Sequence, residues 1–208
     1  MQTFARVEMP AVAVRLSSSS AVEQLLAGNR RYIDGRPTHT EHTARREETA
    51  DAQHPFAIVL CCSDSRVSPE ILFDQGIGDL FVIRVAGNVA TDVGIGSIEY
   101  AISHFGSALL VVLGHTSCGA VRATVDTLAN GGCAPGHIMA IVDEIMPAAK
   151  ATCDEPGDKL LNAVKANTKA VAAKLAGLPP IIAPAVERER LRVVSMLYTL
   201  STGEVSQL

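Results

Sequence analysis

Residues 109–118 read LLVVLGHTSC, a run of five apolar residues followed closely by a histidine, two hydroxyl residues and a cysteine. A short run of this kind, without alternating polar residues, is typical of a strand that is covered on both faces. Two further runs have the same character, residues 56–62 (FAIVLCC) and residues 80–85 (LFVIRV). Together the three runs predict a parallel sheet that lies between layers of helices.

Helical patterns separate and follow these strands, at residues 96–105, 120–128, 138–150 and 158–175. Near the end of the chain, residues 190–200 and 204–208 flank the turn Ser201-Thr202-Gly203 and predict a closing hairpin. The alternation of strand and helix indicates right-handed crossovers. We therefore expect an α/β fold with a mostly parallel sheet of about five strands, the last one antiparallel at the edge.

The region before the first strand predicts a helical arm. Val22, Leu25 and Tyr32 form an apolar stripe after a serine cap at Ser20, with Glu23 three residues later. This stripe has no obvious partner within the chain, which favours a homodimer or a dimer of dimers. Residues 37–53 predict a loop with a short helix. We expect residues 1–19 to form a mobile tail, with organellar targeting left open, and residues 20–208 to form a single domain.

Composition excludes several classes of protein. The 208 residues are 48% hydrophobic and 19% charged, which is typical of a globular chain, and the apolar runs are shorter than the ~18 residues of a membrane span. A net charge of −4 and the absence of Trp argue against nucleic acid as a partner. Five cysteines, an odd number without regular spacing, argue against a disulfide framework and favour a reducing, cytoplasmic location.

Two strand ends carry residues that can hold a metal. Cys62 follows the first apolar strand, and His115 and Cys118 follow the third. Because ligands gather outside the carboxyl ends of parallel strands, we expect these three side chains to converge. Two thiolates and one imidazole leave one position of a tetrahedral zinc open, as in catalytic sites. A buried cysteine is more often a small apolar residue, and we interpret Cys61, on the opposite side of the strand, in that way.

Asp64 and Arg66 stand within four residues of Cys62. An arginine can hold a carboxylate in a forked pair and keep it ionised, so that the carboxylate accepts a hydrogen bond from metal-bound water. The alternative is that the two residues cap a helix after the strand. Asp64 is also close enough to swing onto the metal as a fourth ligand, in a closed state at lower pH.

Four motifs resemble those of the β-class carbonic anhydrases in order and approximate spacing. They are CSDSRV (62–67), FVIRVAGN (81–88), GSIEY (96–100) and GHTSCG (114–119). The similarity extends from about residue 21 to residue 208 and is strongest between residues 53 and 119. Many members of the family have RNAGN where this chain has RVAGN (84–88).

The resemblance implies a zinc enzyme that converts carbon dioxide and water to bicarbonate and a proton by zinc-bound hydroxide. It assigns one Zn²⁺ per chain to Cys62, His115 and Cys118, and the catalytic dyad to Asp64 and Arg66. It also implies a substrate pocket that is built partly from the neighbouring subunit. The residues at the matching pocket positions are Gln53, Phe81, Tyr100 and Gly119.

Two other functions remain open at the level of sequence. The same metal site could hydrolyse a related small molecule, carbon disulfide or carbonyl sulfide. The chain could also be a catalytically silent zinc-binding homologue, although an intact dyad beside three ligands argues against this. A redox dithiol at Cys61 and Cys62 is disfavoured, because adjacent cysteines rarely pair and the chain contains no C-x-x-C motif.

Overall fold

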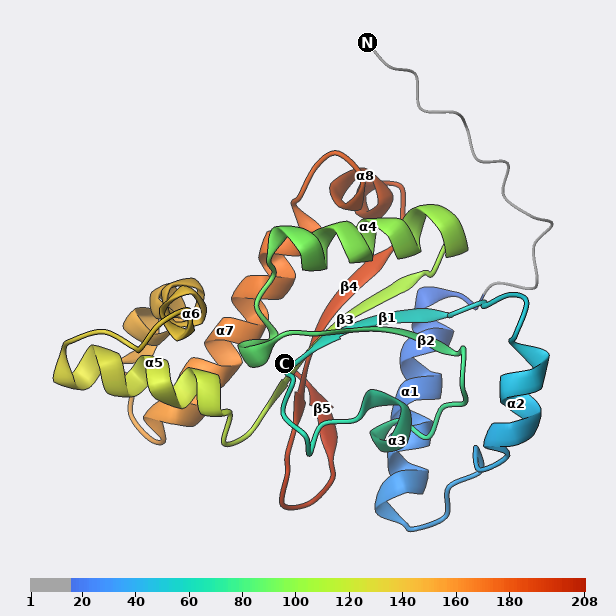
Figure 1. Ribbon diagram of the computed structural model, residues 1–208, viewed down its shortest axis with the longest axis horizontal. Helices are drawn as coiled ribbons and strands as arrows, with labels where there is room; N and C mark the ends of the chain where they lie inside the picture. Colours follow the sequence, from blue (N-terminus) through green and yellow to red (C-terminus); the bar gives the residue numbers. More distant parts are fainter. Residues whose placement is uncertain (1–15) are drawn as a thin grey trace.

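The computed structural model describes residues 16–208 and is built around one five-stranded sheet (Figure 1). The strands lie in the order β2-β1-β3-β4-β5. Their bounds are β1 (Ala57–Cys61), β2 (Leu80–Arg84), β3 (Leu109–His115), β4 (Arg192–Tyr198) and β5 (Val205–Gln207). The first four pair in parallel, and β5 pairs antiparallel with β4 at the edge. The predicted α/β fold and its closing hairpin are confirmed.

The predicted helices are also present, with small shifts of their ends. They are α1 (Ser18–Ile33), α2 (His42–Glu48), α4 (Asp92–Phe105), α5 (Gly119–Asn130), α6 (Ile138–Thr152) and α7 (Lys159–Ala176). Three short elements were not predicted, because fewer than two turns show no apolar period. These are α3 (Pro69–Leu72), α8 (Ile182–Glu187) and the 3₁₀ turn η1 (Ala86–Asn88). In residues 16–208 we find no helix with the length and apolar character of a membrane span.

Both faces of the sheet are covered, as its apolar strands predict. Every residue of β1 and β3 is buried. Val59 and Cys61 on one face of β1 pack with residues of α1 and α3. Ile58 and Leu60 on the other face pack with residues of α4, α7 and α8. Figure 1 shows α5 and α6 beyond the end of the sheet at which β3 leads into α5.

Helix α1 corrects two predictions. Its N-cap is Ser17, which accepts a hydrogen bond from Ser20 N, so Ser20 lies inside the helix and is not the cap. Its apolar stripe does have a partner within the chain, because Val22 and Leu25 are buried against the sheet. Asn29 Nδ2 adds a hydrogen bond to the carbonyl of Gly203, far away in the sequence. The predicted tail lies outside the described residues except for residues 16–19, of which 18 and 19 belong to α1.

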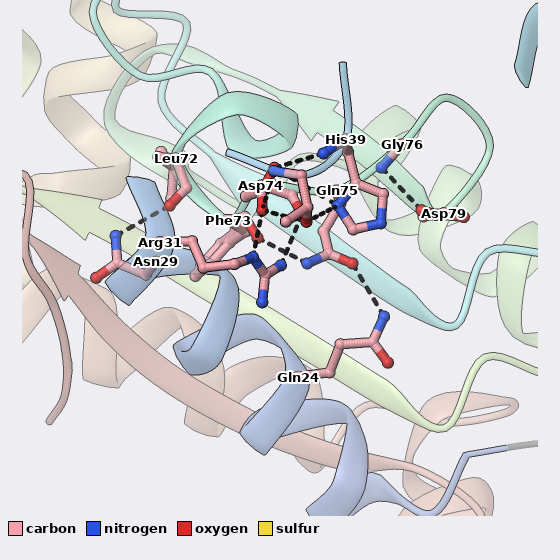
Figure 2. A network of polar contacts seen from close by, with 11 residues as sticks. Gln24, Asn29, Arg31, His39, Leu72, Phe73, Asp74, Gln75, Gly76 and Asp79 are labelled. Atoms are coloured by element: carbon pink, nitrogen blue, oxygen red, sulfur yellow. Dashed lines mark hydrogen bonds and ion pairs between the residues drawn. The ribbon is translucent and has the colours of Figure 1, made fainter. Parts of the chain in front are cut away.

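Asp74 is the centre of a polar network that joins α1 and the segment after it to the end of α3 (Figure 2). Its side chain is 2% exposed and accepts hydrogen bonds from Arg31 Nε, Thr38 N and Oγ1, and His39 N. Burial opposes ionisation, but these donors outweigh it and hold the pKa of the Asp74 carboxyl well below its usual range. The network therefore depends on the charged form.

We expect Asp74→Asn to lower the free energy of unfolding by about 2 kcal/mol at pH 7, because a buried charge-assisted network loses its charge. Asparagine tolerates the left-handed backbone of this residue (φ 45°), so the variant adds no strain. Since the folded-state pKa is lowered, the stabilisation is present above the unfolded-state value of ~4 and is lost as pH falls through the folded value. Urea denaturation should show a difference that shrinks below pH ~4. An equal difference at pH 7 and pH 3 would contradict this explanation.

Candidate metal centre

Three potential metal ligands converge at the carboxyl ends of β1 and β3. Cys62 follows the last residue of β1, His115 ends β3, and Cys118 is the N-cap residue of α5. All three are buried, and their ligand atoms lie within 4.8 Å of one another. The Sγ atoms of Cys62 and Cys118 are 4.0 Å apart. Because β1 and β3 are parallel neighbours in register, the two tips meet as predicted.

The turn from β3 to α5 brings Cys118 back toward His115. Ser117 has a left-handed backbone (φ 58°), which reverses the chain immediately after the strand. Cys118 then stands at the start of α5, where the N–H groups of Val121 and Ala120 favour its ionised form. A sharp turn and a helix N-terminus thus place the Cys118 sulfur next to the imidazole.

The hydrogen bonding of His115 leaves the correct nitrogen free for a metal. Its Nδ1 lies 2.9 Å from the carbonyl oxygen of Thr116, so Nδ1 carries the hydrogen and donates it. In the neutral imidazole, Nε2 then has the lone pair. Within residues 16–208 this buried atom has no hydrogen-bond partner. A buried, unpartnered ring nitrogen beside two thiols is a group that a bound metal would satisfy.

The contact between the two thiols favours the ionisation of only one of them. Hydrogen bonding from Cys118 lowers the pKa of the Cys62 thiol, against the opposing effect of burial. The same contact, together with burial, raises the pKa of Cys118, because a second thiolate would lie beside the first. A divalent cation would remove this repulsion and allow both thiols to ionise. Two thiolates and a neutral imidazole match the preference of zinc.

Asp64 and Arg66 form the predicted forked pair. Arg66 Nε donates to Asp64 Oδ1 at 2.9 Å and Arg66 Nη2 donates to Oδ2 at 2.7 Å. These bonds hold the pKa of the Asp64 carboxyl well below its usual range. Asp64 Oδ2 also lies 4.0 Å from His115 Nε2, the unpartnered nitrogen of the metal-binding candidates. The N-cap residue of α3 is Ser68, so Asp64 does not cap that helix, and its role as a fourth ligand stays a prediction.

The loop that carries Cys62 and Asp64 is held by the end of β2. Arg84 Nη2 donates to the carbonyl of Asp64 at 2.7 Å, and Gly87 N donates to Cys62 Sγ at 3.3 Å. Gly87 has φ 72°, and a Cβ there would lie 2.6 Å from Ile145 Cδ1. Sequence reasoning gave these residues no role. The available signal was a Gly-Asn pair directly after an apolar strand, which indicates a turn with a special backbone.

Cys61 lies on the opposite face of the sheet from Cys62, as predicted. It packs in the apolar cluster under α1 and α3, whereas Cys62 packs with Cys118 in another cluster. Burial raises the pKa of the Cys61 thiol to about 12. It therefore stays neutral and belongs to the core.

The predicted pocket residues lie in different parts of one chain. Phe81 on β2 and Tyr100 on α4 have ring centres 6.4 Å apart, and Phe81 packs with the cluster under α4. Gln53 is exposed before β1, and Gly119 is the first residue of α5, next to Cys118. The structure thus brings Phe81 and Tyr100 together. Their role in binding substrate remains a prediction.

The chain is similar to known carbonic anhydrases. A family model described as carbonic anhydrase matches residues 57–205. A carbonic anhydrase of Mycolicibacterium smegmatis is 46% identical over 130 residues, which are 62% of this chain and 63% of that protein. Carbonic anhydrase 2 of Mycobacterium tuberculosis is 42% identical over 130 residues, with the same coverage. The match therefore spans less than two thirds of the length of these curated relatives.

A solved structure shows the same similarity in three dimensions. The β-carbonic anhydrase of Coccomyxa, determined in complex with acetazolamide, matches with a TM-score of 0.71 and 26% sequence identity. The match covers 90% of this chain and 86% of that one. The segment matched by the family model includes all three metal-binding candidates as well as Asp64 and Arg66. The chain belongs to the β-class carbonic anhydrase family.

Proposed function

We propose that this protein is a zinc enzyme that catalyses the reversible hydration of carbon dioxide to bicarbonate and a proton. The observation that carries the proposal is the buried group of Cys62, His115 and Cys118 with the Asp64 carboxylate beside it. Three protein ligands leave one position for a water, which is the arrangement of a catalytic zinc site. Membership of the carbonic anhydrase family supports the same activity.

Cys62, His115 and Cys118 would hold the metal, which when bound supplies Lewis acidity that makes a water nucleophilic near neutral pH. Asp64 would accept a hydrogen bond from that water at Oδ2 and so direct the oxygen lone pair toward carbon dioxide. Arg66 keeps Asp64 ionised through the fork. Arg84 keeps the Asp64 backbone in place through its bond to the carbonyl oxygen.

The substrate pocket is the second part of the proposal. The rings of Phe81 on β2 and Tyr100 on α4, whose centres are 6.4 Å apart, suit a linear non-polar molecule such as carbon dioxide. They would serve the metal site of a neighbouring subunit. The amide of Gln53 and the backbone of Gly119 would bind the bicarbonate oxygens.

Metal analysis tests the ligand assignment. The purified protein is expected to contain about one zinc per chain, and Cys118→Ser is expected to lose most of it, because a neutral hydroxyl replaces a thiolate. Cys133→Ser is the matched control, since Cys133 is exposed and lies outside the three-residue group. Full zinc occupancy in the Cys118 variant would show that the ligands are assigned wrongly.

Stopped-flow measurement with a pH indicator tests the reaction. The zinc-loaded protein is expected to hydrate carbon dioxide, and Asp64→Asn to lower kcat/KM by about 100-fold, because the amide keeps the shape but loses the charge. Asp154→Asn, at an exposed acid, is expected to change nothing. Parallel assays with carbonyl sulfide and carbon disulfide identify the substrate. Turnover of these alone would overturn the proposal, and zinc without any turnover would identify a silent homologue.

We further propose that the chain assembles as a homodimer or a dimer of dimers. The support is the side of α4 that carries Val93 and Tyr100, 82% and 49% exposed, together with β2 at the edge of the sheet.

Light scattering is expected to give about twice the chain mass of 21.9 kDa, or a multiple of it. Val93→Asp should raise the dissociation constant at least about tenfold, because it would place a charge in an apolar contact. Ile138→Asp, at a residue that is 49% exposed on α6, is the control. A wild-type monomer with full activity would contradict the assembly.

A further inference from the structure

Asn167 is a buried amide in the middle of α7, and none of the motifs at the strand ends includes it. Its side chain is 2% exposed, and the same helix buries Val164 and Val171. Burying an amide is unfavourable unless it forms hydrogen bonds. The partner of Asn167 therefore indicates what the residue does.

The partner of Asn167 is the turn that contacts a metal ligand. Asn167 Nδ2 donates to the carbonyl oxygen of Gly87 at 2.9 Å, across 80 positions of sequence. Gly87 in turn donates its own N–H to Cys62 Sγ at 3.3 Å. A glycine has wide backbone freedom, so its orientation depends on what holds it. The amide of Asn167 thus holds the carbonyl group of Gly87, and the N–H group of Gly87 contacts the sulfur of Cys62.

The next residue of α7 contacts the other ligand strand. A Cβ on Gly114 would lie 2.1 Å from Thr168 Oγ1, so α7 approaches the backbone of β3 closely at the residue before His115. Consecutive positions on one helix thus reach both ligand-bearing ends, one through Gly87 and the other directly. Asn167 acts toward Cys62 through Gly87, and Thr168 packs against Gly114 next to His115.

We propose that Asn167 is a positioning residue that holds the Gly87 N–H on Cys62 Sγ and so sets how strongly this sulfur binds the metal. The proposal rests on the metal site described under the proposed function. An N–H donated to a thiolate withdraws part of its charge and orients its lone pairs. Without the amide, the Gly87 carbonyl oxygen loses its donor, so the Gly87 N–H is held less firmly on the sulfur and both effects are weakened.

The test compares Asn167→Leu with Asn29→Leu in the full chain. Leucine has nearly the shape of asparagine and no donor. Asn29 is the matched control, since it is also 2% exposed and donates to the backbone carbonyls of Leu72 and Gly203, but on α1. Both variants should lose thermal stability. Only Asn167→Leu should bind zinc at least about tenfold more weakly in competition with a chromophoric chelator.

A second readout is spectroscopic and does not depend on activity. With Co²⁺ in place of zinc, the sulfur-to-metal charge-transfer band should shift in Asn167→Leu and stay at the wild-type position in Asn29→Leu. Wild-type zinc affinity and an unshifted cobalt band in Asn167→Leu would overturn the proposal and leave the metal site intact. A wild-type chain that binds neither metal would overturn the site itself, and the positioning role with it. If the leucine variant does not fold, Asn167→Ser is judged by the same two readouts.

Discussion

The parallel pairing of β1 with β3 is the constraint on which the rest of the site depends. Cys61 of β1 lies opposite Leu113 of β3, so the residues that follow the two strands leave the sheet at the same edge. Both strands are buried on both faces, so a shift by one residue would exchange the side chains that pack against the two helix layers. The distance between the ligands is therefore a property of the sheet.

Asp64 and Asp74 have pKa values that are lowered for the same physical reason, but the two carboxylates have different roles. Asp64 and Asp74 both have lowered pKa values, because hydrogen-bond donors outweigh the cost of burial. Asp74 accepts hydrogen bonds from α1 and from the segment after it, which ties both to the end of α3, and this network contributes to stability. Asp64 is held mainly by one arginine, so its carboxylate remains directed toward the neighbourhood of His115 Nε2. The charge of Asp74 stabilises the fold, and the charge of Asp64 lies beside the metal-binding candidates.

The helices behind the sheet do more than cover it. The approach of α7 to Gly114, and the contact of Ile145 on α6 with Gly87, occur at glycines that leave no room for a side chain. Both glycines are next to metal-binding candidates, in sequence for Gly114 and in space for Gly87. Packing against backbone leaves no flexible side chain that could adjust. It therefore fixes the relative position of two segments more firmly than packing between flexible side chains does. The metal centre is thus supported from the core side.

The sequence by itself determined the strands, the main helices, the three metal-binding candidates and the Asp64–Arg66 pair. These features are local: apolar runs mark strands, and the residues after them carry the chemistry. Only the tertiary structure decided what covers α1, which groups donate hydrogen bonds to Asp74 and which residue holds Gly87. Asn29 reaches Gly203 across 174 positions and Asn167 reaches Gly87 across 80. A local pattern shows that a residue is buried, but not which partner it has, because that partner is chosen by the packing of distant segments.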